Sequence, residues 1–252
     1  MMPAIIFTYT VTASLAVPVS DFGYAVRIPA DTSCQRLLRQ HVAVERGVVR
    51  GEKQDPLGNR ILTGACRGTS ARFACTVRGK ALIDPSRPET DGDGQYTEAT
   101  GRTHVGGLLR VFYLHNSAVG DALDRARHFC RMLRGEIALR TSFPGTRTAE
   151  EAMECGAGTS EDLAHIIAAL CRLDNISVRY VMGLGPLGPA AWVEVWNGWN
   201  WTAIDPLTGN LCGASYLKIA HGRDADDIAL AAFSQGCELE HTEISSSLST
   251  RP

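Results

Sequence analysis

The feature that most constrains this fold is a change in hydrophobic periodicity near residue 108. Before that point apolar residues alternate with polar ones, as in FTYTVTASL (residues 7–15) and RFACTVRGKALI (residues 72–83). A period of two residues is typical of strands that bury one face. After residue 108 the apolar residues recur every three or four positions, which is the helical period. The sequence therefore predicts a β-rich region followed by a region with helices and further strands, an α+β fold.

Residues 1–90 are expected to form an antiparallel β-sandwich or barrel domain. Several short alternating segments follow one another, and Pro and Gly within residues 55–59 favour a turn. Residues 91–107 are rich in Gly, Asp and Thr and read as a linker or loop before a core domain over residues 108–252. The β-rich region contains no evident titratable cluster, so we expect it to serve as a scaffold or as a surface for a partner.

The core is expected to begin with helices and to continue with strands. One helix is predicted over residues 119–133, and a second near residue 148, where Thr148 and Glu151 have the spacing of a capping box. A third is predicted from Thr159, with an apolar stripe along one face. Three strands should follow, with a loop between Gly183 and Pro189, and a last strand from Glu243.

Composition excludes several classes of function. The chain has a formal net charge of −2 and no long basic run, so nucleic acid and anionic membranes are not expected partners. No apolar run reaches the roughly 18–20 residues of a membrane span, and the N-terminus lacks the basic segment of a signal peptide. The eight cysteines form no CxxC pair and the seven histidines no HxH or HExxH motif. We therefore expect a cytoplasmic protein with reduced cysteines, no metal and no cofactor.

Three segments carry a resemblance to a known family. They are GAGTSEDLAHIIAALCRLDNISVRYVMGL (residues 156–184), AAWVEVW (190–196) and WNWTAIDPLTG (199–209). They resemble the transglutaminase-like superfamily, whose bacterial members read GVCxDxAHL, then HAWVEV, then a strand that ends in Asp-Pro. TAEEAMECGAGT (148–159) and GRDADDIALAAFSQG (222–236) extend the resemblance to nearly the whole chain. It implies a papain-like arrangement of Cys, His and Asp, with the cysteine at a helix N-terminus.

Residue by residue, the resemblance implies a degenerate triad. Ser160 stands at the cysteine position, Ala190 at the histidine position, and Asp205 keeps the aspartate. The surrounding motif residues are retained, and we expect Glu161, Trp192 and His165 to help bind a substrate.

The two replacements remove the thiol chemistry. A cysteine at a helix N-terminus beside an imidazolium becomes a thiolate, whereas a serine hydroxyl needs a positioned general base. Ala190 offers only a methyl group at the base position. In the family the aspartate at the Asp205 position orients the imidazole. When the imidazole is absent, the Asp205 carboxylate lies too far from the base position to act as the base itself. We therefore predict neither transglutaminase nor cysteine protease activity.

Each candidate also has a purely structural interpretation. Ser160 suits a helix start, and Asp205 before Pro206 could begin a turn. His165 lies on the same helix as Ser160 and is more often a packed histidine than a replacement base. Cys155 and Cys171 do not align with the nucleophile and are expected to be structural.

Three hypotheses for the function stay open. The preferred one is a repurposed enzyme that cyclises, isomerises or hydrolyses a small metabolite in the former thiol pocket, with Asp205 as the acid–base group. The second is a pseudoenzyme that binds a small molecule or a protein partner. The third is a laboratory variant in which Cys→Ser and His→Ala inactivate an ordinary thiol enzyme, which a comparison with the gene would show.

Overall fold

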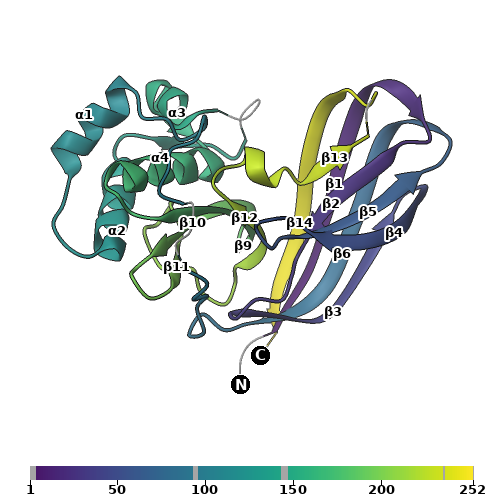
Figure 1. Cartoon of the computed structure of the whole chain (residues 1–252), viewed down its shortest axis with the longest axis horizontal. Coiled ribbons are helices and arrows are strands. Elements are labelled where there is room, and N and C mark those ends of the chain that lie inside the picture. Colours follow the sequence, from purple (N-terminus) through teal and green to yellow (C-terminus); the bar gives the residue numbers. More distant parts are fainter. Residues whose placement is uncertain (1–3, 93–95, 143–146, 235, 252) are drawn as a thin grey trace.

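The structure is a computed structural model that describes residues 4–92, 96–142, 147–234 and 236–251. Its helices lie in one half of the molecule and two long antiparallel sheets in the other (Figure 1). This arrangement confirms the predicted α+β class. Among the described residues, no helix is both long and apolar enough to cross a membrane.

The first third of the chain, with two strands from its C-terminal end, forms a sandwich of two four-stranded sheets. One sheet has the order β14-β1-β6-β3 and the other β13-β2-β5-β4. The bounds of the six N-terminal strands are β1 Ala4–Ser20, β2 Gly23–Ile28, β3 Gln35–Val44, β4 Gly47–Gln54, β5 Arg60–Cys66 and β6 Thr69–Ile83. The alternation of apolar and polar residues buries one face of these strands, as predicted. On β1, Phe7, Tyr9 and Val11 are buried while the residues between them are partly exposed.

The sandwich also takes strands from the C-terminal end of the chain. β14 (Leu239–Arg251) pairs antiparallel with β1, and β13 (Ala231–Phe233) pairs with β2. The last strand was predicted only from Glu243, and the sequence does not reveal that its partner lies at the opposite end of the chain. The division into domains at residues 90 and 108 stays a prediction, but the sandwich itself includes residues from both ends.

The core sheet has the order β11-β10-β9-β12. Four helices and a short parallel pair of strands accompany it among the described residues. The remaining bounds are α1 Gly107–Asn116, α2 Ala122–Leu133, β7 Ala138–Leu139, α3 Ala149–Cys155, β8 Ala157–Gly158, α4 Ser160–Leu173, β9 Val178–Gly185, β10 Gly188–Trp196, β11 Trp201–Ile204, β12 Leu217–Gly222 and the 3-10 helix η1 Asp226–Ile228.

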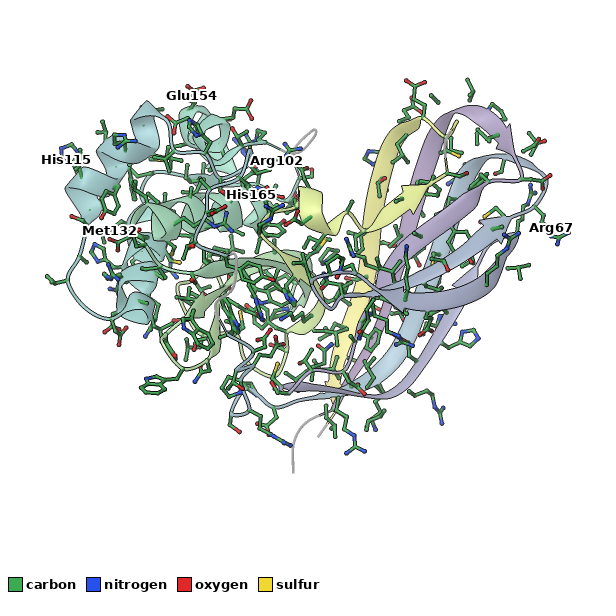
Figure 2. The ribbon with its side chains drawn as sticks, viewed as in Figure 1. Arg67, Arg102, His115, Met132, Glu154 and His165 are labelled. Atoms are coloured by element: carbon green, nitrogen blue, oxygen red, sulfur yellow. The ribbon has the colours of Figure 1, made fainter. Side chains whose placement is uncertain are left out.

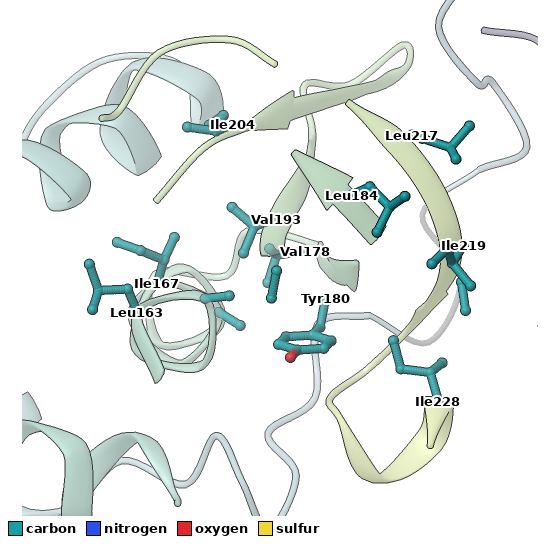
Figure 3. Close-up of a cluster of buried hydrophobic side chains, with 14 of the residues drawn as sticks. Leu163, Ile167, Val178, Tyr180, Leu184, Val193, Ile204, Leu217, Ile219 and Ile228 are labelled. Carbon is teal, nitrogen blue, oxygen red and sulfur yellow. The ribbon is translucent and has the colours of Figure 1, made fainter. Parts of the chain in front are cut away.

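Helix α4 packs its apolar side on one face of this sheet. Figure 3 shows α4, with Leu163 and Ile167, beside Val178 of β9 and Val193 of β10 in one apolar cluster. All four side chains are buried almost completely. The opposite face of β10 carries Trp192 and Glu194, because neighbouring strand residues point to opposite sides. The sheet therefore separates α4 from the region described below as a cavity.

Three local predictions need correction. The helix predicted over residues 119–133 begins at Ala122, because Asp121 caps it by accepting from the Asp124 amide, and Val119 lies outside it in solvent. α1 is a separate helix that the periodicity did not resolve. The segment from Gly183 to Pro189 is mostly strand, since β9 and β10 form a tight hairpin in which Gly188 has φ +124°.

The segment between β6 and α1 (residues 84–106), called the linker from here on, overlaps the expected linker of residues 91–107 and lies against the core. The amide of Trp201 donates to the carbonyl of Glu89, and that of Val178 donates to the carbonyl of Tyr96. Residues 93–95 of this segment lie outside the described residues. The described linker residues therefore form one wall of the core sheet's open face.

Candidate functional site

The first part of the site is the start of helix α4. Thr159 caps the helix, and the carboxylate of Asp162 accepts a hydrogen bond from the Thr159 amide at 2.8 Å. This is the reciprocal capping box that fixes a helix start. Arg147 forms a 2.7 Å ion pair with the same buried carboxylate. The position of Ser160, the first residue of the helix, is therefore fixed by its neighbours.

The Ser160 hydroxyl lies against strand β10. Its Oγ accepts a hydrogen bond from the amide of Ala191 at 3.2 Å. Ser160 is therefore next to Ala190, as the resemblance implies for the cysteine and histidine positions. The described contact makes the hydroxyl an acceptor, and no described imidazole or carboxylate accepts its proton.

Asp205 follows strand β11, on the far side of β10 from β9. Its carboxylate is almost buried and accepts three hydrogen bonds, two of which come from its own turn: the amide of Leu207 at 2.9 Å and the hydroxyl of Thr208 at 3.0 Å. The third comes from the hydroxyl of Tyr216 at 2.9 Å. The aspartate is thus both a turn former, as its structural interpretation supposed, and the acceptor for a phenol.

Tyr216 lies near Ala190. A Cβ placed on Gly185 would lie 3.4 Å from the Ala190 Cβ and also 3.4 Å from the Tyr216 Cε1. One edge of the phenol ring and the Ala190 methyl group therefore both adjoin the same position at Gly185, while the phenol hydroxyl reaches Asp205. The ring also makes an edge contact with Trp192, with centroids 5.5 Å apart. Burial, and secondarily the charge of Asp205, raise the pKa of Tyr216, so the phenol is a proton donor to the carboxylate.

The thiols near Asp205 are buried and weakly acidic. Burial raises the pKa of Cys212, and the charge of Asp205 raises it further. The same two causes raise the pKa of Cys130, on the buried side of helix α2, to about 12. Because the thiolate is the reactive form of cysteine, both side chains remain unreactive thiols near neutral pH.

A cavity of about 410 Å³ opens on the Trp192 face of the core sheet. Its lining includes Trp192, Tyr216 and Cys212 but not Ser160, Ala190 or Asp205. Further apolar walls come from the linker, from α2 and from the loop before β12: Pro85, Pro88, Leu123 and Leu211, with Trp201 and Ala203 from β11. The open space therefore lies beyond Tyr216, and the phenol separates it from Asp205.

Charged side chains close one end of this cavity. Lys218 of β12 contacts Glu194 at 2.8 Å and Glu89 of the linker at 3.1 Å. Although burial opposes it, the two carboxylates raise the pKa of Lys218, so its ammonium is charged. Behind them, Arg179 pairs with Glu89 at 2.9 Å and stacks on the Trp201 ring at 4.0 Å. The cluster ties the linker to the sheet, and three of its members line the cavity.

The expected substrate-binding residues do not gather in one place. Trp192 lines the cavity. Glu161 is exposed on the surface. Partial desolvation of its carboxyl by the surrounding protein raises the pKa of Glu161, and the charge of Asp162 raises it further. His165 is fully buried: its Nε2 accepts from the Ala225 amide at 3.2 Å and its ring stacks on Tyr180 (Figure 2). Burial lowers the pKa of His165 to about 4, so the ring is neutral.

Sequence reasoning missed Tyr216, Lys218 and Glu89. Tyr216 lies in a loop without a motif, and Lys218 and Glu89 are far apart in the chain. The alternation of residues in AWVEVW does place Trp192 and Glu194 on the same face of the strand. This was the one indication in the sequence that a charged side chain lies beside Trp192 at the cavity. Among the described residues, no group of three or more His, Cys, Asp or Glu side chains could hold a metal ion.

Comparisons with known proteins agree with this architecture. Residues 114–206 match the family model of the transglutaminase-like superfamily. The fold resembles that of a proposed cysteine protease from Cytophaga hutchinsonii, with a TM-score of 0.78 at 18% identity over 98% of this chain and 91% of that one. A proposed protease from Parabacteroides distasonis matches with a TM-score of only 0.32 at 10% identity, over 81% of this chain and 47% of that one. No curated protein matched the sequence.

The similarity to the first structure extends over both halves of the molecule, while the family match falls on the helices and on strands β9 to β11. The chain therefore has a transglutaminase-like α+β fold, and its residues 114–206 are similar to the transglutaminase-like superfamily.

Proposed function

We propose that this protein has lost thiol acyl transfer and binds a small molecule in the cavity on the Trp192 face of the core sheet. The observation that carries the proposal is the hydrogen bond from Tyr216 to Asp205. In the family that the sequence resembles, the aspartate orients an imidazole. In this chain the phenol of Tyr216 is the hydrogen-bond partner of Asp205 instead. In this proposal Tyr216 takes the room of an imidazole at position 190, which is supported by Tyr216 lining the cavity while Ala190 and Asp205 do not.

The loss of acyl transfer follows from the arrangement at Ser160. A serine nucleophile needs a base to take its proton, and the Ser160 hydroxyl accepts from a backbone amide instead. Loss of triad members typically lowers the rate by several orders of magnitude. We expect no transfer from a glutamine peptide to a primary amine, and no cleavage of a peptide substrate. Turnover that disappears in Ser160→Ala would contradict this part of the proposal.

The cavity lining defines the kind of ligand. Trp192, Trp201 and Tyr216 present flat apolar surfaces, and Lys218 with its two carboxylates provides polar groups at one end. A volume of about 410 Å³ lies in the range of roughly 300–1,000 Å³ that small-molecule sites occupy. We infer a ligand with a flat, mostly apolar body and one hydrogen-bonding end.

Dye binding tests this ligand site. The neutral naphthalene dye prodan should fluoresce more strongly when it enters the cavity, and Ala203→Phe should weaken binding because Ala203 lines the wall. Ala232→Phe is the matched control, since Ala232 is an exposed residue of β13 far from the cavity. Equal binding by both variants would contradict a ligand site on the Trp192 face.

Acid–base turnover of the bound molecule is the second candidate, and it corresponds to the repurposed enzyme. The same Tyr216–Asp205 pair favours it, because it joins two titratable groups at the edge of the cavity. Asp205→Asn should then abolish conversion of a bound ligand without preventing its binding. Unchanged conversion in Asp205→Asn would exclude a role for the aspartate in catalysis.

A further inference from the structure

The two sheets of the sandwich each end in a strand whose outer edge has no described partner strand. β3 pairs with β6 and β4 pairs with β5, and these are the terminal strands of their sheets. They follow one another in the chain, so both lie at the same open side of the sandwich. Each also has a register shift, at Leu38 in β3 and at Arg50 in β4. A strand edge of this kind can accept an added strand from another polypeptide.

A groove of about 680 Å³ runs between these two edges. Leu37 and Leu38 of β3 line it, with Val49 of β4 and Leu62 of β5. Leu38 and Val49 are 46% and 43% exposed, so they present apolar surface to solvent. An extended segment lying in the groove would cover these side chains and could also pair with a free strand edge.

The surroundings of the groove are cationic. Arg36, Arg39, Arg50 and Lys53 are exposed on β3 and β4, and within the described part of the chain none of them forms an ion pair. The acidic side chains at the groove already have partners. Glu52 pairs with Arg60 at 2.7 Å, and Asp31 accepts from the Leu37 amide at 2.6 Å.

The cations continue across the outer face of the β3 sheet. In the register of β3 with β6, Arg39 lies opposite Lys80, and Arg78 lies two residues before Lys80 on the same face of β6. All three are exposed. Like charges directly opposite one another destabilise an antiparallel pair, so this arrangement is unfavourable for the free protein. An anionic partner would relieve the repulsion.

We propose that the groove between β3 and β4 binds an extended acidic segment of a partner protein. Side chains on one face of a strand repeat about every 6.8 Å. Arg78 and Lys80 of β6 have the same repeat, since they lie two residues apart, and Arg39 of β3 lies opposite Lys80. A segment that alternates acidic with apolar residues therefore meets the cations with one face and the groove with the other.

Two other occupants fit less well. Cationic residues alone can protect an edge strand from unwanted pairing, but such protection does not require exposed Leu38, Val48 and Val49 beside the edge. Single-stranded nucleic acid is usually held by aromatic stacking as well as by charge, and β3 and β4 contain no Phe, Tyr or Trp. The pattern of apolar and cationic side chains thus favours a protein segment.

Fluorescence anisotropy with the full chain tests the proposal. The probe is a labelled octapeptide that alternates valine and glutamate, compared with one that alternates valine and lysine and with a ten-nucleotide uridine RNA. Only the glutamate peptide should bind, and hydrogen exchange should then slow in residues 35–54. Equal binding of the lysine peptide, tighter binding of the RNA, or unchanged exchange in residues 35–54 would overturn the proposal.

Charge reversal provides the matched comparison. Arg36→Glu/Arg39→Glu should weaken binding of the glutamate peptide by about tenfold or more. Arg67→Glu/Arg72→Glu makes the same change in net charge at exposed positions, and Figure 2 shows Arg67 at the far end of the sandwich. That control should keep its affinity within about twofold. Equal losses in the two variants would show that net charge alone attracts the peptide and would overturn the docking site.

Discussion

The Asp205 carboxylate is supplied with hydrogen-bond donors by the protein itself. It receives hydrogen bonds from its own turn and from Tyr216, so its acceptor sites are occupied without an imidazole. A buried carboxylate left without donors would be unfavourable by several kcal/mol. In the proposed account, the phenol of Tyr216 thus stabilises the site without a histidine at position 190.

His165 gives the clearest pH dependence at the scale of one residue. Its pKa is lowered by burial from 6.5 to about 4, against the opposing charges of Asp224 and Asp162 and with a further lowering by Arg102. The unfolded chain therefore takes up a proton at a higher pH than the folded protein. This stability is fully present above pH 6.5 and is lost as the pH falls towards 4.

We predict that the free energy of unfolding decreases by on the order of 2–3 kcal/mol through this group between pH 6.5 and 4. His165→Phe keeps a ring against Tyr180 and removes the titration. Urea unfolding at several pH values should show a flatter profile for this variant. His221, whose pKa is also lowered by burial, titrates in both proteins and provides the common background. An unchanged slope in His165→Phe would contradict the assignment.

At the scale of elements, the decisive feature is the pairing of β14 with β1. The register places Leu248 opposite Phe7 and Ser247 opposite Thr8. Leu248 is half-buried against the sandwich core, whereas Ser247 is exposed on the outer face. The two faces of β14 therefore contribute differently to stability, although the residues are adjacent in sequence.

Adjacent aspartate substitutions should separate the two faces. Leu248→Asp places a charge against the apolar core, and we expect a loss of about 1–3 kcal/mol in the free energy of unfolding. Ser247→Asp should change it by no more than about 0.5 kcal/mol. Denaturant titration of both variants measures the difference. Similar losses would mean that β14 does not pack in this register.

For the whole molecule, the sequence predicted what its local patterns encode. The alternation through Phe7, Tyr9 and Val11 marked a buried strand face, and the capping residues Thr148 and Thr159 marked helix starts that the structure confirms. The return of β14 to β1 could not be read, because pairing between distant segments leaves no local signal. The sequence also did not predict that the cations of β3 and β6 gather on one surface. They are spaced along two strands and do not form a continuous basic run.

Prediction of the candidate site from the sequence had the same limits as prediction of the fold. Motif spacing pointed to Ser160, Ala190 and Asp205, and the Ser160–Ala191 hydrogen bond brings the first two together. Tyr216 lies eleven residues after Asp205 in a loop, so its contact depends on the folded path of the chain. The central claim is that Ala190 stands where an imidazole would activate a thiol and that Tyr216 fills that room.

The most direct test is the thiol pKa of Ser160→Cys, measured from the pH dependence of alkylation by iodoacetamide, with the exposed Cys155 as the internal reference. Ser160→Cys/Ala190→His/Tyr216→Ala restores the imidazole and clears its space. The account predicts that the introduced thiol has a pKa more than about one unit lower in the triple variant than in Ser160→Cys. Equal thiol pKa values in the two variants would contradict it.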